Sequence, residues 1–361
     1  MANTVGQYSF LDRMIHRLAF SGVGVQMTAA DIEDKIFQAE LASTAAENPI
    51  FITSLPRAGT TILLVALASV PGMATHLYRD MPFVMAPLLW NQISARFRQS
   101  AELQERAHGD GIKIGMDSPE AFEEVIWRAF WPDHFRKNDI VPWDQTNIND
   151  DASAFFDRHL RKIVALRIGS GQTGRYISKN NANIARLDLL PDLFPGANVI
   201  VPVRQPIAHA ASLLRQHQNF MTRHTDDPFT RRYMGDIGHY EFGHLHKPIS
   251  FTGFAELSKG FSPSDIDYWL AYWIAAFETV KDAGDHVHLL RFESFCEDGR
   301  QGATRLCDIL NIDQKFANQI GNHFHPAPLL DDGVARHKSP LRDEAEALHA
   351  SLFDKSAHNG I

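Results

Sequence analysis

The segment from Pro49 to Gly72 places the strongest constraint on how this chain folds. Pro49-Ile50-Phe51-Ile52-Thr53 is a short apolar run, typical of a parallel strand that is buried on both faces. After a glycine-containing turn, residues 60–70 form a second apolar run of helical length, which Pro71-Gly72 ends. A strand that leads through a short turn into a buried helix predicts an α/β fold.

Strand-like and helical segments continue to alternate along the chain. Residues 176–179, 198–203 and 287–292 are largely apolar runs with the length of strands. Because Pro202 lacks the N–H that a sheet ladder needs, we expect it at an edge, a bulge or the end of its strand. The alternation predicts a parallel β-sheet flanked by helices on both faces.

Two helices between these strands are marked by the spacing of their apolar residues. Apolar side chains from Ile184 to Phe194 recur at helical intervals before the Pro195-Gly196 turn. The most regular pattern runs from Ile266 to Phe277, with Ser264 as its expected N-cap. Both segments are therefore predicted to be helices of the α/β fold.

The whole chain, residues 1–361, is expected to form a single domain. It has no repeat, low-complexity tract or flexible linker that would divide it. Two stretches interrupt the alternation: residues 81–170 are mostly helical and rich in aromatics, and residues 216–262 show little periodicity. We interpret both as substrate-side insertions, because open α/β sheets bind ligands beyond their strand ends.

The composition limits the kinds of partner this chain can have. Its formal net charge is −8 at pH 7, so no overall positive field attracts nucleic acid or an anionic membrane. No run approaches the roughly 18 apolar residues of a membrane span. Charges interrupt the amphipathic residues 10–20, which we expect to pack on their own domain rather than on a membrane surface. A cytoplasmic protein is the expectation, and its oligomeric state stays open.

Metal sites and a disulfide framework are not expected. The two cysteines, Cys296 and Cys307, have no metal-site spacing and are too few for a framework. Any anionic ligand must therefore be held by a local cluster of protein donors.

The turn after the first strand carries residue types that bind an anion. Backbone N–H groups at a helix N-terminus point outward at the positive end of the helix dipole. Gly59 permits close approach of the backbone, and Thr60, Thr61 and Arg57 add hydroxyl donors and a planar cation. The same residues would also suit an ordinary strand–helix turn, so the turn alone assigns no ligand.

Comparison with the nucleotide-binding P-loop, G-x-x-x-x-G-K-[ST], argues against a kinase or NTPase. With Gly59 as the second glycine of that motif, Ser54 replaces the first glycine and Thr60 replaces the lysine. Thr61 alone fits the last position. The lysine that contacts the β- and γ-phosphates is therefore missing.

Pro56-Arg57-Ala58-Gly59-Thr60-Thr61 resembles the first phosphosulfate-binding loop of the sulfotransferase superfamily, P-[KR]-[SA]-G-T-T, throughout. In that family the loop binds the 5′-phosphosulfate of 3′-phosphoadenosine 5′-phosphosulfate (PAPS). The resemblance implies this role for residues 57–61. It also implies a P-loop-like sulfotransferase fold and a reaction that needs no metal.

A second segment resembles the family's site for the 3′-phosphate of PAPS. There an arginine at a strand end is followed eight residues later by a serine, and Arg204 and Ser212 have this spacing. Pro206 suits the first turn of the intervening helix. The order of the two segments along the chain also agrees with the family, so the resemblance implies that Arg204 and Ser212 bind the cofactor.

Lys179 is the third candidate, at the end of a predicted strand between the two motifs. Family members often place a lysine there, where its charge stabilises the bridging oxygen as the sulfur–oxygen bond breaks. Small-molecule members have a catalytic histidine two residues later, but Asn181 occupies that position here. Asparagine is no general base, so either another residue takes the proton or the acceptor needs little base assistance.

Asp80 is the predicted general base. Other branches of the family use a carboxylate just after the strand that follows the first helix, which here corresponds to residues 73–78. Asp80 follows this strand, and His76 within it is the alternative. The sequence does not rank three further histidines, His134, His217 and His325.

These assignments predict an enzyme that transfers a sulfuryl group from PAPS to a hydroxyl or an amine, with Lys179, Arg57 and Asp80 as its catalytic groups. A small molecule, a lipid and a saccharide all stay open as acceptors. Aromatic residues that would either line the acceptor pocket or pack in the core are Phe83, Trp90, Trp127, Phe130 and Trp131. The alternatives are a P-loop kinase or NTPase-like enzyme and a non-catalytic nucleotide-binding protein.

Overall fold

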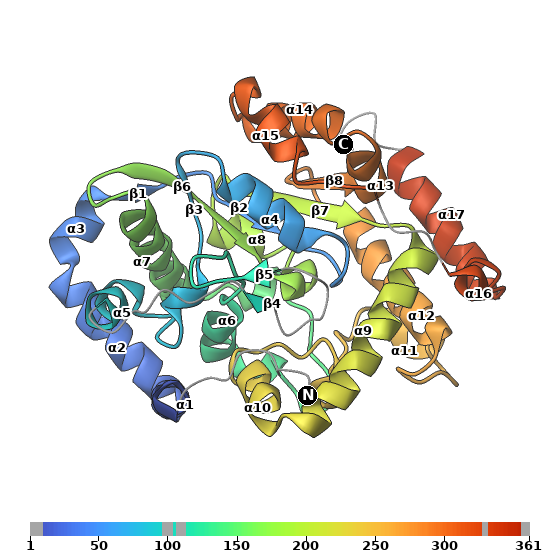
Figure 1. The fold of residues 1–361 in the computed structure, drawn as a ribbon, viewed down its shortest axis with the longest axis horizontal. Coiled ribbons are helices and arrows are strands. Elements are labelled where there is room, and N and C mark those ends of the chain that lie inside the picture. Colours follow the sequence, from blue (N-terminus) through green and yellow to red (C-terminus); the bar gives the residue numbers. More distant parts are fainter. Residues whose placement is uncertain (1–9, 96–103, 106–112, 327–330, 355–361) are drawn as a thin grey trace.

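The structure, a computed structural model, describes residues 10–95, 104–105, 113–326 and 331–354 (Figure 1). Its strands are β1 (Ala45–Ala46), β2 (Ile50–Ile52), β3 (Met73–Ala74), β4 (Gln104–Glu105), β5 (Lys113–Ile114), β6 (Thr173–Lys179), β7 (Asn198–Val203) and β8 (Val287–Arg291). The helices of the first half are α1 (Phe10–Ala19), α2 (Val23–Ile36), α3 (Gln38–Ser43), α4 (Thr60–Ala68), α5 (Pro87–Ser94), α6 (Glu124–Phe130) and α7 (Asp150–Arg167). Those of the second half are α8 (Leu190–Leu193), α9 (Pro206–Asp226), α10 (Pro228–Asp236), α11 (Phe254–Leu257), α12 (Ile266–Lys281), α13 (Phe292–Glu297), α14 (Gly299–Leu310), α15 (Ala317–Gly321), α16 (Asp332–Ala335) and α17 (Pro340–Asp354).

The central sheet is parallel and brings three strand ends together. Its order is β1-β6-β2-β7-β8, and β3 also pairs with β6. Ile52, the last residue of β2, lies opposite Lys179 of β6 on one side and Ile200 of β7 on the other. The segments that follow β2, β6 and β7 therefore leave the same edge of the sheet, where parallel sheets bind their ligands.

Side chains of the central strands alternate between two buried faces. Ile50 and Ile52 of β2 pack with apolar residues of α4, α14 and α15, while Phe51 packs on the opposite side with α6, α7 and α12. All three side chains are fully buried, and each such burial stabilises the fold by about 1.5–3 kcal/mol. Figure 1 shows the two layers, with α14 and α15 on one side of the sheet and α6 and α9 on the other. The predicted fold class, a parallel sheet flanked by helices on both faces, is confirmed.

Pro202 lies at the penultimate position of β7, as expected for a proline near a strand end. The last residue of β7 that pairs with β2 is Ile200, because β2 ends at Ile52. The missing N–H of Pro202 therefore removes no hydrogen bond to β2. Its carbonyl oxygen instead accepts a hydrogen bond from Oγ of Ser54, at 2.7 Å.

Three local expectations differ from the structure. The helix expected between Ile184 and Phe194 is two pieces, a 3₁₀ helix (Asn181–Ala185) and α8, because Pro191 cannot continue a helix that begins before it. Helix α12 begins after Asp265 rather than Ser264. The strand expected at residues 73–78 is confined to Met73–Ala74, and a 3₁₀ helix (Tyr78–Asp80) follows.

The N-terminal segment is a helix that packs on α10. His16 of α1 contacts Asp236 through Nε2 at 3.0 Å, and its ring lies 5.1 Å from the ring of Tyr233. This is the packing expected of an amphipathic helix on its own domain. None of the described helices combines the length and the apolar character needed to cross a membrane.

Candidate functional site

The turn between β2 and α4 has a backbone that depends on glycine. Arg57 has a φ of 74° and Gly59 a φ of 90°, so two of its residues adopt the left-handed conformation. A Cβ added at Gly59 would lie 2.3 Å from Cε2 of Phe292, which leaves room for hydrogen only. Gly59 is the N-cap of α4, and no described side chain caps this helix. The first backbone N–H groups of α4 thus keep the arrangement that binds anions.

The two predicted cofactor segments meet at this turn. Nε of Arg57 donates to Oγ of Ser212 at 3.3 Å, although 155 positions separate them in the chain. Nη1 of Arg204 donates to the backbone oxygen of Arg57 at 3.1 Å. Arg204 follows the end of β7, and Ser212 lies on α9. The structure therefore brings Arg57, Arg204 and Ser212 into one site.

This corner of the molecule gathers positive charge. Burial lowers the pKa of the Arg204 guanidinium, Glu293 opposes that shift, and the neighbouring Arg57 charge lowers the pKa further. His209, fully buried on α9, has its pKa lowered to about 3 by burial and by Arg204, so it stays neutral. Its Nε2 donates to the backbone oxygen of Pro56 at 2.7 Å. An anion bound between the two guanidinium groups would offset their mutual repulsion.

Lys179 and Asn181 lie beside the same turn. Lys179 is buried at the end of β6, opposite Ile52. Oγ1 of Thr60 donates to Oδ1 of Asn181 at 3.3 Å, and Oγ1 of Thr53 donates to its backbone oxygen at 3.2 Å. Asn181 therefore contacts the turn directly. It is the position at which small-molecule members of the family carry a catalytic histidine, and here its side chain is an amide.

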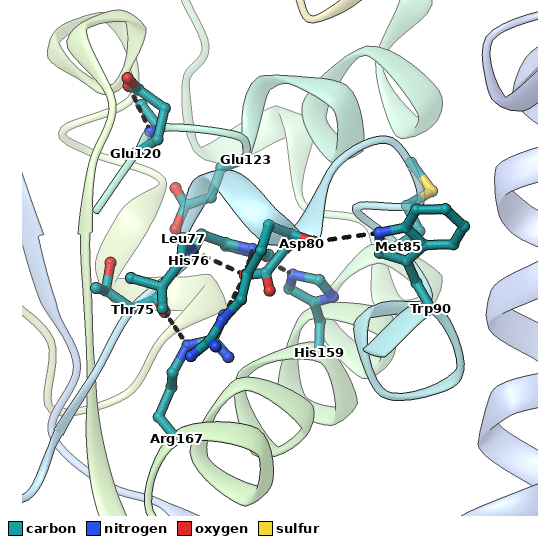
Figure 2. Close-up of polar contacts among 12 residues, drawn as sticks. Thr75, His76, Leu77, Asp80, Met85, Trp90, Glu120, Glu123, His159 and Arg167 are labelled. Carbon is teal, nitrogen blue, oxygen red and sulfur yellow. Dashed lines mark hydrogen bonds and ion pairs between the residues drawn. The ribbon is translucent and has the colours of Figure 1, made fainter. Parts of the chain in front are cut away.

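Asp80 lies in a different, enclosed cluster, shown in Figure 2. Its carboxylate forms an ion pair with Arg167 of α7 and accepts the backbone N–H of Leu77 at 2.9 Å. Nδ1 of His76 lies 3.3 Å from the same carboxylate oxygen, and Nε2 of His76 lies 2.9 Å from Nε2 of His159. Burial alone would raise the pKa of Asp80, but His76 and Arg167 outweigh it and hold the pKa below its usual value.

Neither predicted proton acceptor of this cluster lines the pocket beside the cofactor turn. Asp80 is 2% exposed and His76 is 1% exposed. The pKa of His159, which stacks on His76, is lowered well below its usual value by burial and by the His76 charge. The structure thus places Asp80 among protein partners and apart from the pocket that adjoins the turn.

That pocket contains about 530 Å³ of empty space, part of it open to solvent. On the side of the cofactor turn it is bounded by Leu55, Pro56, Asn180 and Asn181. Its aromatic wall consists of Tyr240, Phe242, Trp269 and Tyr272. Its titratable lining residues are Glu124, His239, Glu241, His246 and Lys247.

The aromatic residues singled out in the sequence lie elsewhere. Trp127 and Trp131 are buried in the core, where Arg186 lies 4.2 Å above the ring of Trp127. Phe83 and Trp90 pack on each other with ring centroids 5.4 Å apart. The pocket wall was not predicted, because the apolar pattern of α12 indicates burial without showing which of its aromatics border a cavity, and Tyr240 and Phe242 lie in a segment with little periodicity.

In the described part of the chain, no group of three or more His, Cys, Asp or Glu side chains is arranged to bind a metal ion. The site at the turn instead contains arginine, hydroxyl and backbone donors. This is the donor set that suits a phosphosulfate or a phosphate.

Comparison with known proteins adds a family and several solved structures. The family described as "Sulfotransferase family" matches residues 49–247. None of the curated proteins matches the chain. Solved structures similar to this one include the sulfotransferase STF9 from Mycobacterium avium, with 13% identity over 98% of this chain and 87% of that chain at a TM-score of 0.47.

Two further solved structures are similar at comparable levels. Sulfotransferase STF1 from Mycobacterium tuberculosis H37Rv is 13% identical over 96% of this chain and 86% of that chain, with a TM-score of 0.48. A sulfotransferase from Alicyclobacillus acidocaldarius is 16% identical over 86% of this chain and 94% of that chain, with a TM-score of 0.38. The family match carries the assignment, since it spans more than half of the chain and includes the turn, Lys179, Arg204 and Ser212. The chain belongs to the sulfotransferase family.

Proposed function

We propose that this protein transfers a sulfuryl group from PAPS to a hydroxyl or an amine. Residues 57–61 hold the 5′-phosphosulfate, and Arg204 with Ser212 holds the 3′-phosphate. Lys179 stabilises the charge that develops on the bridging oxygen as the donor bond breaks. The acceptor occupies the pocket beside Leu55 and Asn181.

The convergence of three distant segments carries this proposal. The turn after β2, the end of β6 and the start of α9 are joined by side-chain hydrogen bonds from Arg57 to Ser212 and from Thr60 to Asn181. Two arginines of this site lie close enough for the charge of one to lower the pKa of the other. Such a concentration of cations beside an uncapped helix N-terminus suits a ligand with two separate anionic groups, as PAPS has.

The pocket supports an acceptor with an apolar or aromatic part. Its wall of Tyr240, Phe242, Trp269 and Tyr272 offers ring faces and edges to such a group. Small molecules and the terminal parts of lipids or saccharides would fit this description.

Thermal unfolding with different nucleotides tests the proposal. Adenosine 3′,5′-bisphosphate, the product left by PAPS, should raise the melting temperature far more than AMP or ATP with Mg²⁺. At a concentration 100 times its dissociation constant, the expected stabilisation is about 2.7 kcal/mol. Equal shifts, or none, would contradict the proposal.

The same measurement separates the alternatives. Preferential stabilisation by ATP with Mg²⁺ would favour a kinase or NTPase, although the P-loop lysine is absent. Tight binding of the bisphosphate without transfer from ³⁵S-labelled PAPS to any acceptor would favour a non-catalytic binding protein.

A further inference from the structure

We infer that His239 is the general base that takes the proton from the acceptor. This inference rests on the proposed function and supplies the group that Asn181 cannot supply. It draws on the geometry of the acceptor pocket, in which His239 is one of two lining histidines.

The end of α10 fixes the position of His239. The backbone N–H of His239 donates to the oxygen of Met234 at 2.9 Å, and that of Gly238 donates to Gly235 at 3.2 Å. These two bonds form a Schellman motif, which needs a left-handed residue just after the helix. Gly238 meets that need with a φ of 84°. His239 is therefore held at a rigid helix end, although residues 216–262 show little periodicity in sequence.

A backbone carbonyl fixes the tautomer of the His239 ring. Nε2 lies 3.3 Å from the backbone oxygen of Ala121, which only accepts, so Nε2 carries the hydrogen. A neutral ring protonated on Nε2 has its lone pair on Nδ1. Among the residues that the structure describes, none forms a hydrogen bond to Nδ1 of His239. This is the arrangement of a base whose second nitrogen is oriented by a carbonyl.

His246, the other histidine of the pocket, has both ring nitrogens engaged. Nδ1 donates to the backbone oxygen of Glu241 at 2.7 Å, and Nε2 accepts from the hydroxyl of Tyr268 at 2.9 Å. Burial lowers the pKa of His246 to about 4. His246 therefore has no lone pair to offer an acceptor.

The carboxylates of the pocket are less suited to the task. Glu124 is held by two nitrogens of Arg186 at 2.7 and 2.9 Å and by Nδ2 of Asn180 at 2.7 Å, so its oxygens are committed. Glu241 also lines the pocket, but a carboxylate is a weaker base near neutral pH than an imidazole. Glu241 is accordingly the competing candidate that the experiment must separate from His239.

Contacts connect His239 to the transfer site. Asn180, which bonds to Glu124, directly follows Lys179 in the chain. Glu124 packs on Gly238, since a Cβ added there would lie 2.6 Å from its Cγ. Gly238, which directly precedes His239, thus packs on a residue that bonds to the loop after Lys179, and His239 lines the same pocket as Pro56 and Asn181.

The sulfuryl transfer needs no reactant other than PAPS and the acceptor. The acceptor oxygen forms a bond to sulfur while the bond from sulfur to the bridging phosphate oxygen breaks, and its electrons stay on the departing bisphosphate. The proton of the acceptor hydroxyl passes to Nδ1 of His239 and later leaves to solvent. The charged and titratable groups that face this ring or its pocket are Glu124, Glu241, His246, Lys247, Tyr240, Tyr272 and Arg128. His224 lines a smaller cavity that His239 also borders.

Two probe acceptors of different acidity test the inference. With benzyl alcohol, which holds its proton tightly, His239→Gln should lower the transfer rate by at least about 100-fold. With 4-nitrophenol, which ionises near neutral pH, the same variant should lose less than about tenfold, because little base assistance is needed. The matched control is His244→Gln, at an exposed histidine of the same segment that does not line the pocket; this variant should lose less than about tenfold with both acceptors.

Nucleotide binding, rescue by imidazole and the pH dependence of the rate distinguish loss of a base from loss of the fold. His239→Gln should be stabilised by adenosine 3′,5′-bisphosphate as strongly as the wild type, which shows that it is folded and binds the cofactor product. In His239→Ala, added imidazole should restore transfer to benzyl alcohol. The rise of the wild-type rate with pH should disappear in the variant.

Several outcomes would overturn the inference. Equal loss with both acceptors in His239→Gln, or no loss with either, would exclude a base at this position. So would a 100-fold loss confined to Glu241→Gln. A wild type that is not stabilised by the bisphosphate would instead contradict the proposed function, which distinguishes the two failures.

Discussion

The turn after β2 holds partly buried charges and the cluster around Asp80 holds buried ones, and the two sites balance them differently. In the cluster, the Asp80 carboxylate is paired with Arg167 and His76 and accepts a backbone N–H. At the turn, Arg57 and Arg204 are both cations; the Glu293 carboxylate raises the pKa of Arg204, and the charge of Arg57 lowers it. The cluster pairs its carboxylate within the protein, whereas the turn holds two arginines together, an arrangement that suits a bound anion.

This difference shows how to tell a binding site from a structural one among buried polar groups. A buried charge whose partners all come from the protein stabilises the fold and leaves little for a ligand. A site with an excess of one sign of charge, an uncapped helix and a glycine that admits close approach suits a ligand of the opposite sign.

The largest effect on stability is expected from Asp80→Ala. This change leaves the Arg167 guanidinium buried without its carboxylate, which should lower the free energy of unfolding by roughly 3–5 kcal/mol. Urea unfolding measures the loss. The control is Asp332→Ala, whose side chain is 92% exposed 3.8 Å from Arg336, with an expected change under about 0.5 kcal/mol.

Affinity for the bisphosphate should not change in Asp80→Ala. If Asp80 is structural, the folded fraction of Asp80→Ala binds adenosine 3′,5′-bisphosphate like the wild type. If Asp80→Ala instead has wild-type stability but no transfer activity, Asp80 is the general base.

Arg57→Ala and Arg204→Ala should lower the affinity for the bisphosphate and leave stability nearly unchanged. Each removes a charged donor worth about 1.5–3 kcal/mol, so affinity for the bisphosphate should fall by about 10- to 100-fold. Urea unfolding of the free protein should change little by comparison. Arg336→Ala, in the exposed basic segment near the C-terminus, is the matched control and should bind normally.

A smaller, graded effect is expected from pH. Burial and the His76 charge hold the pKa of His159 well below its ordinary value of 6.5, so the folded protein keeps this ring neutral. The stability this provides is complete above about pH 6.5, and it decreases by up to about 1.4 kcal/mol per pH unit as the pH falls below that value. Asp80, whose pKa is also lowered, adds a further loss below about pH 4.

Urea unfolding between pH 7 and pH 5 measures this dependence. His159→Gln should make it less steep, because one of the buried histidines with a lowered pKa is then an amide that does not titrate in this range. An unchanged slope in the variant would place the pH dependence on other buried histidines, such as His209.

Local patterns in the sequence were sufficient to predict the sheet and the meeting of the turn with Arg204 and Ser212. The apolar runs at β2 and β7 are short and nearly continuous, as strands buried on two faces require. The turn and Arg204 both follow strand ends, so the parallel order of the strands was enough to bring them together. The predicted roles of these residues in binding PAPS stay predictions until a ligand is measured.

The partners of Asp80 and His239 could not be predicted, because they lie far away in the sequence. Asp80 follows its strand as expected, but Arg167, which pairs with it, lies 87 positions further along the chain. His239 and Ala121 are 118 positions apart, and no spacing indicates that a carbonyl would orient this ring. Such contacts depend on how α6, α7 and α10 pack, which the pattern of apolar residues does not specify.

The central claim is that the turn and Arg204 bind a nucleotide with separate 5′ and 3′ anionic groups. Isothermal titration calorimetry with adenosine 3′,5′-bisphosphate and with AMP, on the wild type and on Arg204→Ala, tests it most directly. We predict that the wild type binds the bisphosphate at least tenfold more tightly than AMP, and that Arg204→Ala removes this preference by losing affinity for the bisphosphate alone. Equal binding of the two nucleotides by the wild type, or an undiminished preference in Arg204→Ala, would contradict the assignment.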